Sequence, residues 1–384
     1  MKILQVNKLY APVVGGVETV VRDIAEGLNE TADMRVLVCQ NKGKATEELY
    51  NNVRVVRASS FGTFLSLPLS FDFFRRYRYM SRDADVIQLH APFPLGDLAV
   101  LFFRRKAGLV VWWHSDIIRQ RLFLILLRPV INHMLRKADL IVVASDAIVK
   151  SSAFLLRHVD KCKVIPFGLD FKLYPEVPAS MGILAGKLND QGCKILLFVG
   201  RLVYYKGVDV LVRAMKNVDD AELFIVGIGP LEDELKDSVQ RFGLESKIHF
   251  LGALDRDMLL GAFYDCDVFV FPSVAKSEAF GLCQLEAMFY GKPVINTNLP
   301  TAVPTVSVDG ETGITVPVGD DVALGAAIMK LMVDDVLRET YGVNAAQRVR
   351  ERFDKTRMIE ELHNSYAALL DKSPIVSEKF EVHR

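Results

Sequence analysis

The chain has 384 residues, 51% of them hydrophobic, and is therefore long enough for two globular domains with large buried cores. Its 47 basic and 47 acidic residues cancel, which argues against a general nucleic-acid-binding protein, because such a protein needs an excess of Lys and Arg to neutralise phosphates. The balance is uneven along the chain: residues 1–170 carry 24 Lys and Arg against 16 Asp and Glu, so we expect this part to prefer anionic partners.

Short apolar runs rich in Val and Ile alternate along the chain with stretches of helical periodicity. The expected strands are residues 3–6, 36–38, 85–89, 109–113, 140–144, 163–167, 194–200, 222–227, 247–252, 268–273 and 292–297. The clearest helical stretches are residues 18–28, 207–215 and 230–242. Near-continuous apolar strands separated by helices are typical of parallel sheets covered on both faces, so the pattern predicts an α/β protein.

An irregular stretch at residues 168–192, rich in Gly, Pro, Asp and Asn, divides the strands into two series. We predict two doubly wound Rossmann-like domains that face one another across a cleft, residues 1–170 and 171–354. The C-terminal segment 355–384, with an amphipathic helix over 355–370, is expected to join the first domain. A β/α barrel is the alternative, and the long irregular joint argues against it.

Cysteine usage and apolar segments bear on where the protein works. The five cysteines are scattered and include no C-x-x-C pair, which indicates a reducing compartment without disulfides or a zinc site. The N-terminal MKILQVN has no signal-peptide character, and apolar windows such as residues 122–127 are interrupted by arginine well before the length of a membrane span. We therefore expect a cytoplasmic protein.

The turns between strands and helices matter most, because open α/β sheets bind ligands beyond the carboxyl ends of their strands. The first expected strand leads into a loop that ends in Gly15 and Gly16, directly before a helix. Paired glycines let a backbone approach a ligand, and a helix start offers free N–H groups to an anion. We expect both glycines to contact the substrate; a tight turn that only requires glycine is the alternative.

A second turn, GRLVYYKG, places Arg201 and Lys206 between a buried strand and a helix. Two cations there suit a diphosphate, which arginine grips with two hydrogen bonds while lysine supplies a point charge; two solvated loop charges are the alternative. A third turn, VGIGPL, suggests a dinucleotide-binding fingerprint, but Glu232 occupies the third glycine position, where it would lie against a pyrophosphate. A nicotinamide-dependent enzyme is therefore not expected.

The fourth turn lies in SEAFGLCQLEAM, where Glu278 falls before the expected helix and Glu286 a little over one turn into it. The free N–H groups of Phe280, Gly281 and Leu282 can hold phosphate oxygens, and the two carboxylates can accept hydrogen bonds from hydroxyls. This spacing suits a sugar nucleotide, with the sugar and the ribose at opposite ends of a diphosphate. An N-cap acid followed by a solvated helical glutamate is the alternative.

Together these motifs resemble the GT-B glycosyltransferases of family GT4, which use nucleotide sugars as donors. The features that carry the resemblance are the Gly15-Gly16 loop, VIPFGLD (164–170), GRLVYYKG (200–207), VGIGPL (226–231), FVFPSVAKSEAFGLCQLEAMFYGKPVI (269–295) and DGETGITVPVGD (309–320). They extend over nearly the whole chain in the order found in the family.

The resemblance implies a role for each matching residue. Glu278 and Glu286 match the family's E-x7-E motif, in which the first glutamate lies against the donor sugar and the second holds the ribose hydroxyls. Arg201 and Lys206 match the pair that neutralises the donor diphosphate. His114, in WWHSD, is similar to the histidine that approaches the reacting end of the donor sugar; a satisfied buried histidine is the alternative.

The sequence departs from the family pattern at two places. Phe167 stands where Asn is common, so a hydrogen bond at the domain joint is expected to be absent. Ala302 stands where many relatives have Gly, which is expected to alter the loop beside the donor site.

The resemblance also implies transfer of a hexose with retention at the anomeric carbon, with GDP-mannose favoured as the donor and UDP-sugars as the nearest alternative. Arg201, Lys206 and the helix start at Gly281 can stabilise the departing diphosphate without a metal ion. The D-x-D at residues 265–267 opens a buried strand and is a poor metal site. We therefore predict neither a metal nor another cofactor.

The acceptor is expected to meet the first domain, as a glycan or lipid-linked molecule in the synthesis of a bacterial surface polysaccharide or glycolipid. Residues 60–82, 101–106 and 119–128 mix Phe and Leu with clustered Arg, which suits an anionic membrane surface. We expect a peripheral protein on the inner face of the cell membrane, with no nucleic-acid partner; buried helices with solvated arginines are the alternative.

Two other functions fit parts of the pattern. A sugar-nucleotide epimerase also uses two such domains and needs no acceptor, although the context of the E-x7-E motif favours a transferase. A non-catalytic nucleotide- or glycan-binding protein would tolerate the loss of Glu278 or His114, and the sequence retains both.

Overall fold

The structure is a computed structural model that describes residues 1–13, 15–64, 67–103, 106–116, 121–188 and 193–372. The chain separates into two compact units: unit 1 holds residues 1–167 and 355–384, and unit 2 holds residues 168–354. The predicted boundary between residues 170 and 171 lies three residues further along the chain. Residues 373–384 of the predicted joining segment lie outside the described residues.

Unit 1 is built on an eight-stranded sheet in the order β10-β9-β8-β7-β1-β2-β4-β3, with a separate two-stranded ribbon of β5 and β6. Its strands are β1 (Lys2–Val6), β2 (Asp33–Cys39), β3 (Thr46–Tyr50), β4 (Val53–Ala58), β5 (Thr63–Phe64), β6 (Leu67–Pro68), β7 (Val86–Ala91), β8 (Gly108–Trp113), β9 (Leu140–Val143) and β10 (Cys162–Val164). Its helices are α1 (Gly16–Leu28), α2 (Asp72–Met80), α3 (Pro94–Phe102), α4 (Arg121–Lys137), α5 (Asp146–Ser151) and α13 (Lys355–Leu370).

The strands of this sheet run parallel, except that β3 pairs antiparallel with β4. Neither strand of this hairpin is among the eleven predicted strands, so the prediction was incomplete in this part of the sheet. β3 is an exposed edge strand and carries polar residues, TEELY, in place of an apolar run. The signal in the sequence is the turn: Asn51 and Asn52 have φ of 47° and 64°, as a two-residue hairpin turn requires.

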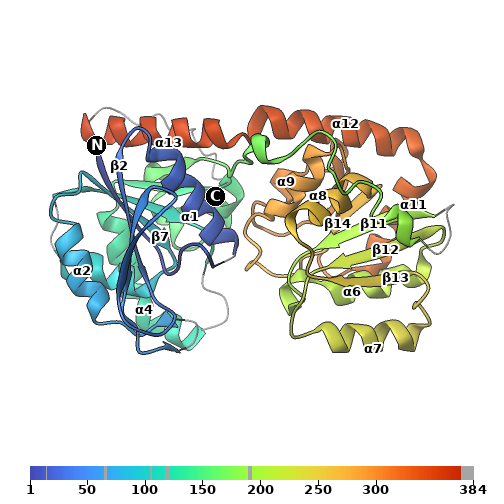
Figure 1. Ribbon diagram of the computed structural model, residues 1–384, viewed down its shortest axis with the longest axis horizontal. Helices are drawn as coiled ribbons and strands as arrows, with labels where there is room; N and C mark the ends of the chain where they lie inside the picture. The colour runs from blue at the N-terminus through green and yellow to red at the C-terminus, as the bar shows by residue number, and fades with distance from the viewer. Residues whose placement is uncertain (14, 65–66, 104–105, 117–120, 189–192, 373–384) are drawn as a thin grey trace. The chain divides into compact units, whose positions relative to one another are not determined.

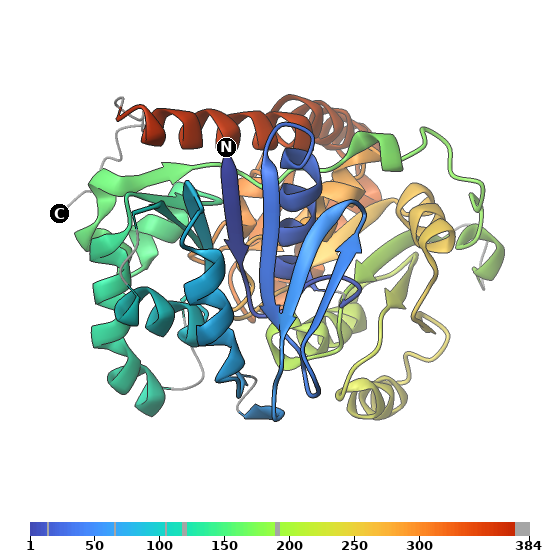
Figure 2. The same ribbon diagram turned by 60° about the vertical axis from the view of Figure 1, so that its left-hand side comes forward.

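The C-terminal helix α13 packs on unit 1. Lys163 donates a hydrogen bond to Ser365 at 2.9 Å, and Ile359 packs directly over Gly27 near the end of α1. Figure 2 shows α13 crossing α1 at this point. A side chain at Gly27 would collide with Ile359, so glycine is what allows the two helices to touch.

Unit 2 is built on a six-stranded parallel sheet in the order β13-β12-β11-β14-β15-β16. Its strands are β11 (Lys194–Val199), β12 (Ala221–Val226), β13 (Ile248–Gly252), β14 (Val268–Phe271), β15 (Val294–Thr297) and β16 (Gly313–Val316), the last of which is also absent from the predicted strands. Its helices are α6 (Val208–Ala214), α7 (Glu232–Phe242), α8 (Arg256–Asp265), α9 (Leu282–Phe289), α10 (Val303–Val306), α11 (Asp321–Val333) and α12 (Asp335–Arg352).

Helices cover both faces of the unit 2 sheet: α6 and α7 lie on one face and α8 and α9 on the other (Figure 1). The apolar strands are buried between these layers, which is why each reads as a continuous run of Val, Ile, Leu and Phe. This strand order reverses direction between β11 and β14, as in a Rossmann fold. The prediction of two doubly wound α/β domains is confirmed.

Unit 2 begins and ends at one place. The backbone N–H of Leu169 donates to the carbonyl of Phe353 at 2.7 Å, and Leu169 forms a parallel β-bridge with Asp354. The chain therefore enters and leaves unit 2 through adjacent residues. None of the described helices in either unit is long and apolar enough to cross a bilayer.

Candidate active site

The predicted site residues of unit 2 follow the two strands between which the strand order reverses. Arg201 and Lys206 lie in the turn between β11 and α6, and Glu278 lies in the turn between β14 and α9. A backbone hydrogen bond of 2.8 Å from Val274 to Tyr205 joins these two turns. Open α/β sheets bind ligands at this reversal point, so the sequence places its candidate residues where the fold favours a site.

Lys206 and Glu278 form an ion pair that is mostly removed from solvent. The Lys206 Nζ lies 2.7 Å from the Glu278 Oε2, and each side chain is 11% exposed. Burial lowers the pKa of Lys206, but the charge and hydrogen bond of Glu278, together with contributions from Cys283 and Tyr205, outweigh this effect, so the pKa of Lys206 is raised and the amine stays protonated. The ammonium also lies 4.8 Å from the centroid of the Phe271 ring. The ion pair thus links the turn before α6 to the turn before α9.

Arg201 differs from Lys206 in its surroundings. Its side chain is exposed, and within the described part of the chain its guanidinium has no hydrogen bond or ion pair. An arginine in this state is available to an anionic ligand.

Glu286 also has partners, although not those that the sequence suggested. Its Oε1 accepts a hydrogen bond from the hydroxyl of Tyr174 at 2.9 Å and one from Nη1 of Arg256 at 3.1 Å. The Arg256 guanidinium lies over the Tyr174 ring, 4.5 Å from its centroid. Burial raises the pKa of Glu286, and Arg256 and Tyr174 oppose this rise. The carboxylate is therefore held in one orientation at the second turn of α9.

Two glycines give the turns their shape. Gly281 has φ of 80° and precedes α9, and a Cβ at this position would lie 2.6 Å from the Phe271 ring. Gly207 has φ of 66° and lies directly against the carbonyl of Pro272. Both positions require the conformational freedom of glycine and leave no space for a side chain.

The start of α9 offers backbone donors, whereas the side chain of Phe280 does not face a ligand. The Phe280 ring is 3% exposed and packs edge-on against Phe353, so it belongs to the core. The backbone N–H groups of Gly281 and Leu282 donate no hydrogen bond within the described residues. These amides can therefore bind an anion in the way that the motif predicts.

The VGIGPL turn has a structural purpose. Gly227 lies directly against the carbonyl of Gly200, and Gly229 lies directly against that of Leu202. The Leu202 N–H also donates to the carbonyl of Ile228 at 3.0 Å. These glycines let the VGIGPL turn pack closely against the turn that carries Arg201. This packing explains why two glycines of the dinucleotide-binding fingerprint are present although the third is absent.

In unit 1, His114 belongs to a buried group of polar side chains that we call the histidine cluster: Gln5, Gln88, His90 and His114. Nδ1 of His90 lies 2.9 Å from Nε2 of His114. The amide Nε2 atoms of Gln5 and Gln88 lie 2.8 Å and 3.1 Å from Nε2 of His90. Gln5 on β1 and Gln88 on β7 are register neighbours, at the point where the strand order of this sheet reverses.

These contacts define the protonation of the cluster. With both amide nitrogens donating, Nε2 of His90 is an acceptor, so His90 carries its proton on Nδ1 and donates it to His114. Burial lowers the pKa of His114 to about 3, and burial together with His114 lowers that of His90 well below its ordinary value. Both rings are therefore neutral near pH 7, and His114 keeps an N–H at Nδ1.

Aromatic rings hold His114 in place. Phe167 stacks on both Trp112 and His114, with ring centroids 5.5 Å and 5.8 Å apart. The departure from Asn at position 167 thus supplies an aromatic stack beside His114. Of the predicted glycines, Gly15 is the extended residue before α1, where a side chain would collide with Glu18, and Gly16 is exposed with open space around it.

Comparison with known proteins identifies the family. Two family models match the chain: "Glycosyltransferase Family 4" over residues 14–173 and "Glycosyl transferases group 1" over residues 184–348. The D-rhamnosyltransferase WbpZ of Pseudomonas aeruginosa is 34% identical over 355 residues, which cover 92% of this chain and 92% of WbpZ. The O-antigen chain mannosyltransferase C of Escherichia coli is 32% identical over 373 residues, which cover 97% of this chain and 99% of that protein. The chain belongs to glycosyltransferase family GT4.

Solved structures agree on the fold of this GT4 glycosyltransferase. Sucrose-phosphate synthase of Thermosynechococcus elongatus superimposes with a TM-score of 0.79 at 22% identity, covering 97% of this chain and 100% of that one. HepE of Anabaena, in complex with UDP, gives a TM-score of 0.78 at 23% identity and covers 96% of this chain and 100% of that one. The prediction of a GT-B fold is confirmed.

The two carboxylates of the D-x-D at residues 265–267 of this GT4 chain accept hydrogen bonds from backbone groups. Asp265 accepts hydrogen bonds from the N–H groups of Gly182 and Leu184 at 2.7 Å and 2.9 Å. Asp267 accepts one from Ile195 at 2.7 Å. Asp265, the last residue of α8, thus holds the segment around Gly182 and Leu184. Asp267, which precedes β14, holds the start of β11. Within the described ranges no group of three or more His, Cys, Asp or Glu side chains is placed to hold a metal.

Sequence reasoning missed several residues of the two sites. Arg256 opens α8 directly after β13 at the same end of the sheet, a position comparable to that of Arg201 after β11. Gln5 and Gln88 interrupt otherwise apolar strands, which is a usable signal, because a polar side chain at a fully buried strand position needs a partner. Tyr174 lies within the irregular joint and carries no such signal.

Proposed function

We propose that this GT4 protein transfers D-mannose, or a sugar of the same configuration, from a GDP-sugar to a glycan or lipid-linked acceptor in bacterial surface-polysaccharide or glycolipid synthesis. The observation that carries the proposal is its similarity, over nearly the full length, to two transferases of related sugars. D-Rhamnose is 6-deoxy-D-mannose, so both relatives are named for sugars of one configuration.

Unit 2 is proposed to bind the donor nucleotide. Arg201, Lys206 and the free amides at the start of α9 would neutralise the diphosphate, which must leave as an anion when the glycosidic bond breaks. Glu278 would accept hydrogen bonds from the sugar hydroxyls while its contact with Lys206 holds the carboxylate in place. Glu286, held by Tyr174 and Arg256, would accept those of the ribose.

We propose that the transfer proceeds with retention and without a metal ion. Support for the second point comes from the cations and backbone amides around the proposed diphosphate position, which supply the charge stabilisation that a metal provides elsewhere. His114 would act as a neutral hydrogen-bond donor to a sugar oxygen, since burial keeps its pKa near 3 and its Nδ1 carries the proton.

The first test is nucleotide binding. Purified protein is heated with GDP, UDP, ADP or their sugar derivatives, and a ligand that binds the folded state raises the melting temperature. A shift selective for GDP and GDP-mannose, lost in Arg201→Ala, supports the proposal. A selective response to UDP-sugars moves the UDP-dependent alternative, suggested by the HepE complex, to the front.

The second test is the reaction itself. Incubation with GDP-mannose and a lipid-linked glycan should extend the acceptor by one sugar, and the anomeric proton of the product should show the configuration of the donor. Conversion of the nucleotide sugar without an acceptor would identify an epimerase instead. Tight binding without turnover would identify a non-catalytic binding protein.

Membrane contact is proposed through α2 and the residue before it. Phe71 is 81% exposed and Tyr79 is 71% exposed. Arg78 is exposed, whereas Arg75 and Arg76 are paired with Asp72 at 2.8 Å and 2.6 Å. Exposed aromatic rings beside a cation suit an anionic lipid surface.

The membrane proposal is tested by co-sedimentation with anionic vesicles. Phe71→Ser with Arg78→Gln is expected to reduce binding, while the matched change in unit 2, Val333→Ser with Arg241→Gln, leaves it unchanged. Equal binding by both variants and the wild type would contradict a role for α2. On this proposal the protein works at the cytoplasmic face of the cell membrane.

A further inference from the structure

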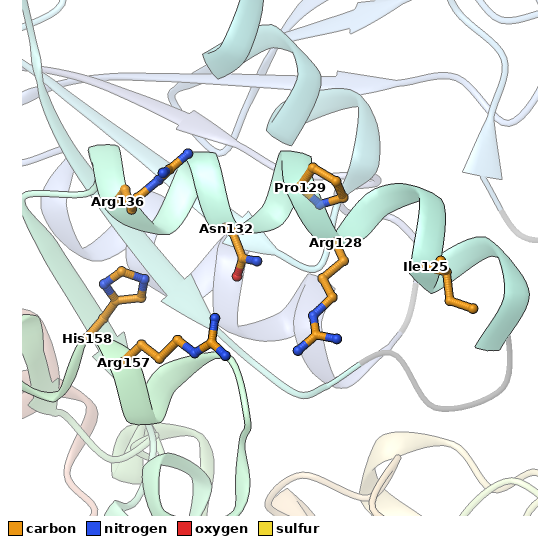
Figure 3. Close-up of a pocket in the computed structure, with 7 residues that line it drawn as sticks. All are labelled: Ile125, Arg128, Pro129, Asn132, Arg136, Arg157 and His158. Carbon is orange, nitrogen blue, oxygen red and sulfur yellow. The ribbon is translucent and has the colours of Figure 1, made fainter.

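A basic pocket lies in unit 1, between α4 and the short helix η1 (Leu155–Arg157), and contains no residue of the histidine cluster (Figure 3). Its volume is about 450 Å³. We call it the arginine pocket, and its polar lining residues are Arg128, Asn132, Arg136, Arg157 and His158.

The positions of these residues follow from helix geometry. Arg128, Asn132 and Arg136 recur every four residues and share one face of α4, while Ile131, on another face, is buried. Arg157 ends η1 and faces them. Figure 3 shows the guanidinium groups of Arg128 and Arg157 pointing toward each other, with Asn132 between them.

The three arginines have no counter-ion among the residues that the structure describes. No carboxylate lines the pocket, and within the described residues the guanidinium groups of Arg128, Arg136 and Arg157 make no ion pair or hydrogen bond. Three cations around one cavity repel one another and concentrate positive potential there. All three side chains are exposed and remain solvated, and the positive potential that they share favours an anionic ligand.

The state of His158 reports on the same potential. Burial lowers the pKa of His158, and the charges of Lys161, Arg136 and Arg157 lower it further, against the opposite effect of Asp160. A bound anion would reverse the effect of the arginines, because it would stabilise the protonated ring.

We propose that the arginine pocket binds the phosphoryl groups that link the lipid to the glycan in the lipid-linked acceptor. Arginine guanidiniums match phosphate oxygens with paired hydrogen bonds, and Asn132 adds an amide donor. The volume exceeds that of a single small ion and lies in the range of sites for phosphorylated molecules with further groups attached. Ile125, which is 70% exposed, and Pro129 form an apolar edge for the first carbons of a lipid. The acceptor assignment rests on the proposed function, whereas the affinity for phosphoryl groups does not.

The affinity for phosphoryl groups is tested with inorganic pyrophosphate. All proteins carry Arg201→Ala, so that the proposed diphosphate site of unit 2 is weakened, and the imidazole NMR signal of His158 is assigned with His158→Gln. Pyrophosphate is expected to raise the pKa of His158. Arg128→Gln with Arg157→Gln should weaken this binding roughly tenfold or more, because each substitution removes charge-assisted hydrogen bonds. The matched control, Arg241→Gln with Lys330→Gln, removes two exposed cations from unit 2 and should leave binding unchanged.

The source of the phosphoryl group is tested with vesicles. One set contains an isoprenyl phosphate with a free terminal phosphoryl group, and the other contains phosphatidylglycerol at matched surface charge. The arginine pocket variant should lose binding to the first set and keep binding to the second. Equal loss from both sets would show general membrane electrostatics and overturn the acceptor assignment. Binding of pyrophosphate without any preference for isoprenyl phosphate would show a site for a free phosphorylated molecule and overturn it as well.

These outcomes separate the pocket from the proposed reaction. The KM for the lipid-linked acceptor is compared between the wild type and Arg128→Gln with Arg157→Gln, both with Arg201 intact. If transfer from GDP-mannose occurs and the two KM values are the same, the inference fails while the proposed function stands. If no transfer occurs but pyrophosphate still acts on His158 through the two arginines, the pocket stands as a phosphoryl site and the proposed function fails. No response of His158 to pyrophosphate overturns the site itself.

Discussion

The two units place polar groups at equivalent points of their sheets, but the groups differ in kind. Unit 1 has the histidine cluster where β1 and β7 meet, and burial keeps both imidazole rings in the neutral form. Unit 2 has the ion pair of Lys206 and Glu278 between β11 and β14, where each charge stabilises the other. A neutral donor suits an uncharged sugar oxygen, whereas a fixed cation suits a phosphate. Under the proposed function, the same topological position would therefore serve a different chemistry in each unit.

Removal of Lys206 should have the largest effect, because it removes the buried charge on which this contrast depends. Lys206→Ala is expected to lower kcat/KM for transfer by roughly 1000-fold, near the upper end for loss of one preorganised electrostatic group. Lys276→Ala, in the following turn but exposed, is the matched control and should change kcat/KM less than twofold. Similar activity in both variants would mean that the ion pair only maintains the fold.

Disruption of the histidine cluster should have the next largest effect. His90→Leu removes the hydrogen bond that fixes the tautomer of His114 and is expected to lower kcat by roughly 100-fold with a small change in donor KM. His90→Asn, which retains an amide donor near the position of Nδ1, should recover part of the activity. The ¹⁵N NMR spectrum of the His114 ring separates this role from simple destabilisation, because only a tautomer change exchanges its two nitrogen signals.

The pH dependence of the transfer rate is a further test of the neutral state of His114. Because the pKa of His114 is about 3, the ring stays neutral at all pH values where the protein is folded and active. The rate of transfer should therefore show no inflection near the ordinary histidine pKa of 6.5. An inflection there that disappears in His114→Asn would contradict a neutral histidine and would indicate a general acid or base.

A smaller effect is expected at Glu286. Arg256→Ala removes one of the two groups that orient the carboxylate, so the KM for the nucleotide sugar should rise about tenfold while kcat changes little. Arg241→Ala, on the exposed side of α7, is the control for charge. A fall in kcat without a change in KM would place Glu286 at the reacting sugar and not at the ribose.

The smallest effect is expected on the free energy of unfolding, from another buried titratable group of unit 1, the carboxyl group of Asp97. Asp97 is buried in α3, both of its oxygens lack partners among the described residues, and burial raises its pKa from 3.8 to about 8. The folded state thus favours the protonated form of Asp97. The contribution of Asp97 to the free energy of unfolding is therefore largest below pH 4, decreases as the pH rises, and levels off above pH 8.

Asp97→Asn should remove this fall. The free energy of unfolding of the variant is expected to match the wild type near pH 4 and to exceed it by about 1–3 kcal/mol at pH 8, measured by urea denaturation. A variant less stable than the wild type at pH 8 would show that the carboxylate has a partner and is ionised in the folded protein.

Much of unit 2 could be predicted because its site lies in short turns that leave strong local signals. Arg201, Lys206, Glu278 and the glycine before α9 all stand directly after buried apolar strands, and the structure brings the two turns together. The hydrogen-bond partners were not predictable in this way. Tyr174 and Arg256 reach Glu286 from segments far away in the sequence, so no local pattern connects them.

Unit 1 was harder to predict for a different reason. Gln5 and Gln88 lie within apolar strands, and their role depends on His90, which the sequence does not distinguish from other histidines. Strand β3 was missed because an exposed edge strand has no core to impose an apolar run. Strand β4 is mostly buried, but Arg54 and Arg57 interrupt its apolar run. Polar groups that act through one another inside a core are therefore the part of a site that requires a structure.

The contact of Leu169 with Phe353 has a consequence for how this protein can be divided. Unit 2 is an uninterrupted insertion whose entry and exit touch, so one continuous gene segment encodes it, whereas unit 1 is encoded in two pieces. A chimaera that exchanges residues 168–354 needs only two junctions, which are adjacent in the structure. Recombination between relatives can thus replace one half of the molecule as a cassette, and laboratory shuffling can follow the same route.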